Sequence, residues 1–131
     1  MGPLLLTLLY FVVAIVVVVI GLFLFENVTR KYKDWDEIKN GNTAVALSIT
    51  GKIIGICIIL SFAIYNSLEL VDTLIWGTIG LVLQLVAYLI FEMLTRSFSV
   101  EEQLSKNNVA VGVVSLGVSI GLAFVIGASI T

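Results

Sequence analysis

The sequence predicts an all-α membrane protein in which four transmembrane helices form two parallel-repeat helical hairpins. Three observations support this fold class: the composition, four long apolar stretches, and a match of the chain to itself at a fixed offset. Of the 131 residues, 60% are hydrophobic and 12% are charged, whereas a soluble domain carries about 25% charged residues. This shortfall excludes a surface that faces water on all sides, and the net charge of −2 excludes the basic field that attracts nucleic acid.

Each apolar stretch is long enough to cross a bilayer, which takes about 20 mostly apolar residues. The stretches cover residues 4–25, 43–65, 73–94 and 109–131. The first lacks the positive start and the small-residue cleavage site of a signal peptide, so we expect it to be retained as a helix. β-branched residues are abundant, but backbone groups in lipid need partners within their own segment, which favours helices over strands.

The two polar loops predict the orientation of the chain. Loops 26–42 and 95–108 carry six of the seven Lys and Arg residues, the seventh is Lys52 within the second helix, and the remaining turn and both termini carry none. The positive-inside rule therefore predicts that both loops are cytoplasmic and that both termini are extracytoplasmic.

The chain matches itself without a gap at an offset of 66 residues, as in the step from Asn42 to Asn108. Agreement at Glu, Arg, Asn and Gly carries more weight than agreement among apolar residues, which is common by chance. We interpret the match as a tandem duplication. The first repeat covers residues 1–66, with helices at about 4–25 and 43–65, and the second covers 67–131, with helices at about 73–94 and 109–131. Both hairpins enter from the same side, so the repeats are parallel.

Small residues on the second and fourth helices predict close helix packing. Gly51 and Gly55 form a GxxxG spacing, and Gly117 and Gly121 repeat it at the matched positions. Helices in lipid associate by close contact, and glycine lets two backbones approach. We expect the second and fourth helices to meet each other, or to meet symmetry mates in a homo-oligomer, through these glycines.

Asn42 and Asn108 stand directly before the second and fourth helices. Asparagine is a favourable helix N-cap because its side-chain oxygen accepts a hydrogen bond from a free amide of the first turn. We therefore expect both to be helix caps. A role in holding an anion at the helix start is the alternative.

Four polar side chains within or at the ends of the spans are candidates for a polar path or a buried pair, namely Lys52, Gln84, Glu92 and Glu26. Lys52 lies nine residues into its helix, or about 14 Å, where a cation costs about 2.5–3.5 kcal/mol. It can snorkel to the surface, pair with Glu92 or Glu26, or line a path. Gln84 and Glu92 share a helix face with Tyr88, which forms either a hydrogen-bonded seam or the wall of a path.

Glu26 and Glu92 each precede an arginine by four residues, Arg30 and Arg96. An exposed pair with this spacing contributes only about 0.3–0.5 kcal/mol. We interpret both pairs as structural clamps at the membrane boundary, with an ion or proton relay as the alternative.

The two helix starts, GNTAVA at residue 41 and NNVAV at residue 107, follow acidic turns. With these turns they resemble a bacterial family of small inner-membrane proteins with a duplicated two-helix unit, classed as domain of unknown function 350. The resemblance covers nearly the whole chain, and Gly112 and Gln103 depart from its alanine and its acid. It implies a multi-pass protein of the bacterial inner membrane, accompanied by membrane-scaffold or envelope-stress proteins, and it implies no activity. The positions that carry it are Glu37, Gly41, Asn42, Ala44, Ala46, Asn108, Ala110 and Gly112.

Two functions remain open. The first is a homo-oligomeric membrane assembly or scaffold component that engages a partner through its cytoplasmic loops, where charges alternate around Trp35. The second is a small ion channel or transporter subunit with a polar path near Lys52, Gln84 and Glu92. The chain has no histidine and a single cysteine, Cys57, so we expect no enzyme, no catalytic or metal site and no cofactor. The expected partners are the lipid bilayer and further copies of the chain, and not nucleic acid.

Overall fold

The computed structural model describes residues 2–28, 34–94 and 99–130, and in these ranges the chain is helical without strands. Four of the helices are long and apolar enough to cross a membrane, which confirms the predicted all-α membrane fold with four transmembrane helices. The helices are α1 (Pro3–Val28), α2 (Asp34–Lys39), α3 (Thr43–Asn66), α4 (Leu70–Leu94), α5 (Val100–Ser105) and α6 (Val109–Ser129).

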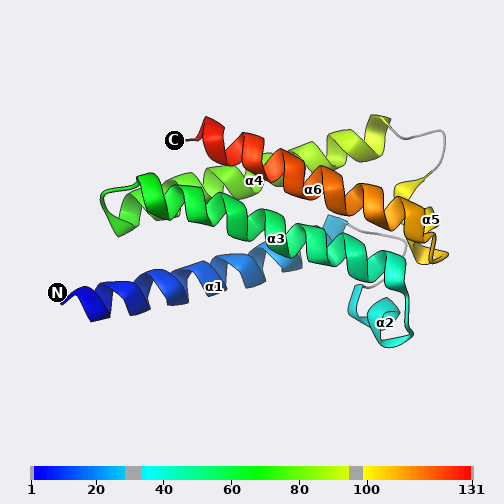
Figure 1. The fold of residues 1–131 in the computed structure, drawn as a ribbon, viewed down its shortest axis with the longest axis horizontal. Coiled ribbons are helices and arrows are strands. Elements are labelled where there is room, and N and C mark those ends of the chain that lie inside the picture. Colours follow the sequence, from blue (N-terminus) through cyan, green and yellow to red (C-terminus); the bar gives the residue numbers. More distant parts are fainter. Residues whose placement is uncertain (1, 29–33, 95–98, 131) are drawn as a thin grey trace.

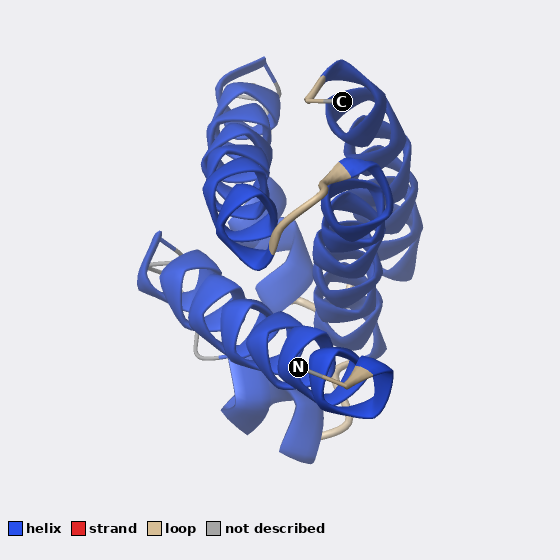
Figure 2. Cartoon of the chain, turned by 90° about the vertical axis from the view of Figure 1, so that its left-hand side faces the viewer, coloured by secondary structure: helices blue, strands red, loops and turns tan. Residues whose placement is uncertain are grey.

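The four long helices run between two ends of the molecule (Figure 1). Both chain termini lie at one end, and the short helices α2 and α5 lie at the other. Figure 2 shows α1 inclined and set apart from the rest of the bundle. Only 11% of the α1 span is buried, against 50% of the α3 span. Helix α3 is therefore the centre of the bundle, and α1 is its most exposed member.

The observed boundaries differ from the expected ones mainly at the turn between the hairpins. We expected the third span to begin at residue 73, but α4 begins at Leu70. The backbone amide of Thr73 already donates to the carbonyl of Glu69 at 3.2 Å, so the helical hydrogen bonds start one turn earlier. The connection consists of residues 67–69 only, which keeps α3 and α4 adjacent.

Three clusters of buried apolar residues hold the helices together, and α3 contributes to each of them. The cluster at the α2 and α5 end places Val100 and Leu104 of α5 against α3. The middle cluster joins α1, α3 and α4 around Phe25 and Tyr88. The cluster at the end with the termini joins α3 and α6, and its members are Ile59, Ala63, Ala123, Ile126 and Ile130.

The approach to α3 and the approach to α6 have the same backbone geometry. Gly41 and Asn107, which are 66 residues apart in sequence, have φ angles of 82° and 59°, in the region that glycine and asparagine tolerate best. Their amides donate to the carbonyls of Ile38 and Leu104, both at 3.0 Å. These paired bonds have the predicted offset, and the duplication itself stays a prediction.

Candidate functional site

A buried lysine marks the most unusual site within the membrane spans. Lys52 of α3 is only 1% exposed, and its Nζ lies 4.7 Å from the ring centroid of Tyr88 and 5.3 Å from that of Phe25. The two rings meet edge to face, with their centroids 5.7 Å apart. Helices α1, α3 and α4 thus form an aromatic cage around an ammonium group, an arrangement that stabilises a cation. A snorkelling side chain would carry its charge to the surface, so that interpretation does not hold.

The cage is connected to a carboxylate near the end of α4. The hydroxyl of Tyr88 donates to Oε1 of Glu92 at 3.3 Å, and Glu92 is half-buried. Glu26 is also half-buried and follows Phe25, the other ring of the cage. An ion pair between Lys52 and either carboxylate stays a prediction. The predicted clamps of Glu26 and Glu92 involve arginines outside the described residues.

Gln84 provides the polar contact between α4 and α6. Its side chain is 3% exposed, and its Nε2 donates to the backbone carbonyl of Ser119 at 2.9 Å. Its Oε1 is buried, with no hydrogen-bond partner among the described residues. A cavity of about 10 Å³ lies beside it, lined in part by Tyr88 and Ser115, which is room for about one water molecule. The space beside Gln84 is therefore small among the described residues.

The polar groups between α3 and α6 form a seam of hydrogen bonds. The hydroxyls of Ser48 and Ser115 are 3.2 Å apart and buried, and the bond from Gln84 to Ser119 continues the seam along α6. Of the two interpretations of the polar face, the hydrogen-bonded seam fits this geometry better than a water-filled path.

The glycines of α3 lie where another chain segment approaches closely. A Cβ placed on Gly51 would be 2.9 Å from the Cα of Leu116, and one placed on Gly55 would be 2.8 Å from the Nε2 of Gln84. Both distances are shorter than real Cβ contacts allow. Gly51 and Gly55 thus permit the close packing of α3 on α6 and α4.

Gly117 and Gly121 do not contribute to this packing. Both are exposed, and nothing lies within 4 Å of a Cβ placed on either of them. Of the two alternatives, contact within the chain is therefore not made by Gly117 and Gly121, because α6 turns a different face toward α3. Contact with a symmetry mate stays a prediction.

Gly112 and Gly127 are the α6 glycines that α3 approaches, and sequence analysis missed their role. A Cβ placed on Gly112 would be 2.9 Å from both the Cα and the carbonyl oxygen of Ala44, and one on Gly127 would meet the ring of Phe62. The available signal was the departure of Gly112 from the alanine that the resemblance implies.

Asn42 caps α3 and joins the two polar loops. Its Oδ1 accepts from the amide of Val45 at 3.0 Å, and its Nδ2 donates to Oε1 of Glu37 at 3.1 Å and to the carbonyls of Leu104 at 2.9 Å and Ser105 at 3.3 Å. This side chain is saturated with protein partners, so the geometry favours a cap over an anion site.

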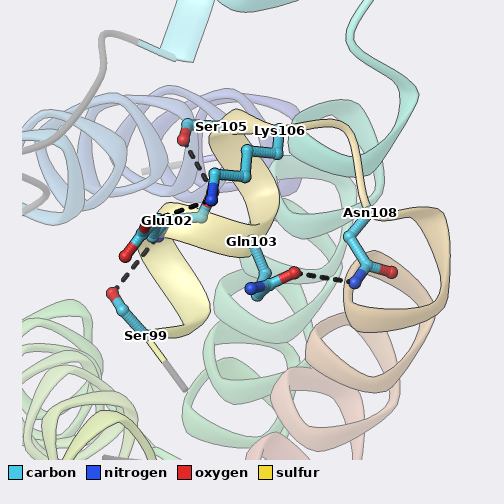
Figure 3. A network of polar contacts seen from close by, with 6 residues as sticks. All are labelled: Ser99, Glu102, Gln103, Ser105, Lys106 and Asn108. Carbon is cyan, nitrogen blue, oxygen red and sulfur yellow. Dashed lines mark hydrogen bonds and ion pairs between the residues drawn. The ribbon is translucent and has the colours of Figure 1, made fainter.

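Asn108 caps α6 with fewer contacts. Its Oδ1 accepts from the amide of Val111 at 3.4 Å, and its Nδ2 donates to Oε1 of Gln103 at 2.9 Å (Figure 3). Gln103, which stands where the resemblance implies an acid, thus still supplies a hydrogen-bond acceptor. In the same loop, Lys106 and Glu102 form an exposed ion pair at 3.1 Å.

Other polar features offer little further chemistry. Among the described residues, no group of three or more His, Cys, Asp or Glu side chains could hold a metal ion. Trp35 of the first loop is 51% exposed, and the segment before α2 lies outside the described residues.

The chain is similar to known membrane proteins over most of its length. A family model described as Domain of Unknown Function (DUF350) matches residues 1–130. The chain is 41% identical to the UPF0719 transmembrane protein YshE of Bacillus subtilis over 92% of this chain and 90% of that protein. It is 34% identical to the UPF0719 inner membrane protein YjfL of Escherichia coli K12 over 79% of this chain and 76% of that protein. No solved structure matches the chain significantly.

Proposed function

Because the chain belongs to the DUF350 family, whose description assigns no activity, we propose its role from its geometry: a homo-oligomeric assembly or scaffold component of the bacterial inner membrane. The names of the two relatives support the location, since one is called a transmembrane protein and the other an inner membrane protein. The role is structural, and its chemistry is that of helix association in lipid.

One observation carries this proposal. Gly51 and Gly55 on α3 are buried in contacts, whereas the matching Gly117 and Gly121 on α6 face outward with nothing near them. Helices in lipid gain association energy chiefly where small residues let backbones approach. An exposed GxxxG face on a helix that crosses the membrane therefore supports association with a further helix, and another copy of the chain supplies one.

The cytoplasmic loops provide a surface for a second partner. Asn42 ties the start of α3 to the end of α5, so the two loops form one structural unit at the end of the bundle (Figure 1). Trp35 is exposed on this unit. Exposed aromatic residues are frequent in protein interfaces, which supports docking of a cytosolic or membrane-associated scaffold protein here.

A channel or transporter subunit is the second candidate, and the buried Lys52 favours it. Ionisable groups within a span usually mark an ion or substrate path, and Tyr88 links the cage around Lys52 to Glu92. The small size of the cavity beside Gln84 counts against a path through the single chain.

Two measurements on the purified full-length protein test these roles. The mass of the protein in lipid nanodiscs should correspond to more than one chain, and a monomer at all protein concentrations would contradict the proposal. In liposomes we expect no flux of small ions above that of empty vesicles. A flux that Lys52→Met alters would replace the assembly role with the channel role.

A further inference from the structure

A groove of about 370 Å³ lies between α1 and α3, on the outside of the bundle. The two helices diverge toward the end with the termini (Figure 1), and α1 is little buried. Apolar atoms dominate the lining, and Cys57, the only cysteine of the chain, is exposed there. The residues that line the groove are Phe11, Ala14, Ile15, Val18, Val19, Cys57, Leu60, Ser61 and Ile64.

Each α3 residue of this groove has a buried counterpart on α6 at the 66-residue offset. The counterparts of Cys57, Leu60, Ser61 and Ile64 are Ala123, Ile126, Gly127 and Ile130. All four counterparts are buried, and they include the α6 residues that pack on α3. The residues that α6 presents to α3 thus occupy the same matched positions as the residues that α3 presents to the groove.

The α1 side of the groove corresponds in the same way to α4. Ala14 corresponds to Gly80, and Val18 corresponds to Gln84. A Cβ on Gly80 would meet Ile59 of α3, and Gln84 lies against Gly55 of α3. Within the chain, α3 therefore occupies the space between α4 and α6, and the groove between α1 and α3 is the counterpart of that space.

The helix face that would fit the groove also exists, on the outside of α6. Helix α3 inserts a face that contains Gly55, Ile59 and Ala63. Their counterparts on α6 are Gly121, Val125 and Ser129, and all three are exposed. The chain therefore has one occupied pair of complementary surfaces and one unoccupied pair of the same pattern.

We propose that the outer face of α6 in one copy inserts between α1 and α3 of a second copy, repeating between chains the packing of α3 between α4 and α6. This inference rests on the proposed homo-oligomer and specifies its contact. Helices α3 and α6 run in the same direction within the chain (Figure 1), so the repeated contact keeps both copies in one membrane orientation. Because the two surfaces differ, the contact is head to tail and produces a ring or an open row of subunits.

The structure predicts one cross-link for this contact. A Cβ placed on Gly55 would be 3.5 Å from the Cβ of Ala123. The counterparts of this pair are Gly121 and Cys57, and a disulfide needs Cβ atoms about 3.5–4.5 Å apart. Cys57 of one copy should therefore form a disulfide with Gly121→Cys of the next. Nothing lies within 4 Å of a Cβ on Gly121, so the substitution leaves the single chain undisturbed.

The experiment mixes two proteins with different tags in liposomes of bacterial lipid and oxidises them with copper phenanthroline. One protein keeps its native Cys57, and the other carries Cys57→Ala with Gly121→Cys. We expect a cross-linked heterodimer. The matched control carries Cys57→Ala with Gly117→Cys, one turn away on the same exposed face, and its yield should be at least about tenfold lower because the reacting atoms lie about 6 Å further along the helix.

The outcomes separate the two proposals. An oligomer in which each cysteine links only to its own kind is symmetric, which overturns the head-to-tail contact and leaves the assembly role. An oligomer that forms no cross-link and retains lipid acyl chains in the groove also overturns the head-to-tail contact and leaves the assembly role. A protein that is monomeric before oxidation and does not cross-link overturns both.

Discussion

Gly112→Ala tests whether the close contact between α3 and α6 holds the fold together. The added Cβ would lie 2.9 Å from both the Cα and the carbonyl oxygen of Ala44, whereas carbon atoms pack best at about 3.5–4.0 Å. Both obstructing atoms belong to a helix backbone, so no side chain can rotate away. The helices must separate by roughly 0.5–1 Å to restore ordinary contact distances.

The expected loss of stability combines three terms. Overpacking costs about 1–3 kcal/mol, and separation of the helices weakens the bond between Ser48 and Ser115, which adds about 0.5–1.5 kcal/mol. The gain from replacing a glycine in the first turn of α6 by alanine returns at most about 1 kcal/mol. We expect Gly112→Ala to lower the free energy of unfolding by about 0.5–4.5 kcal/mol on these terms.

The measurement is an SDS titration in mixed micelles, followed by circular dichroism, with Gly117→Ala as the matched control. Nothing lies within 4 Å of a Cβ on Gly117, so this control should gain about 0.5–1 kcal/mol. Equal stability of the two variants would refute the argument. It would mean that α3 and α6 do not approach each other closely at Gly112.

Three further predictions concern topology, the buried lysine and the caps. A reporter that is active only in the periplasm should be active when fused at Thr131, and one that is active only in the cytoplasm should be active when fused in the first loop. An active cytoplasmic reporter at Thr131 would contradict the predicted orientation. Lys52→Met should lower stability by about 3–5 kcal/mol if the ammonium forms a buried pair, and adding Glu92→Gln should recover part of that loss; full stability of the single variant would exclude the pair. Asn42→Ala should cost about 2–3 kcal/mol, because it loses the cap and the hydrogen bonds from the side chain to the carbonyls of Leu104 and Ser105. Asn108→Ala should cost about 1 kcal/mol. Equal thermal shifts would show that the link between the loops contributes nothing.

The sequence was sufficient for the spans because their signal is strong. Length and apolar composition identify a membrane helix almost irrespective of its partners, and the asparagines that stand before α3 and α6 cap these helices through contacts only three residues away. The start of α4 was less accurate, since the charged residues Glu69 and Asp72 make this segment resemble a loop, although the helical hydrogen bonds begin there.

The environment of each glycine could not be predicted, because sequence spacing identifies a helix face but not its neighbour. Gly51 and Gly117 occupy matched positions, yet the first is buried against Leu116 and the second is exposed. A symmetric contact between repeats would bury both glycines together.

A head-to-tail contact explains why the matched positions differ. Such a contact uses two different faces, so within one chain α3 and α6 would each have one face occupied and one face vacant. On α3 the occupied face contains Gly55, whereas on α6 it contains Gly112 and Ser115, and Gly121 is left outside. Within the single chain, a glycine at residue 121 brings no gain in stability, since alanine is the better helix former by about 1 kcal/mol. A glycine at an exposed mid-helix position is therefore more easily understood if a further helix approaches it, which is the condition that the cross-link between Cys57 and Gly121→Cys measures.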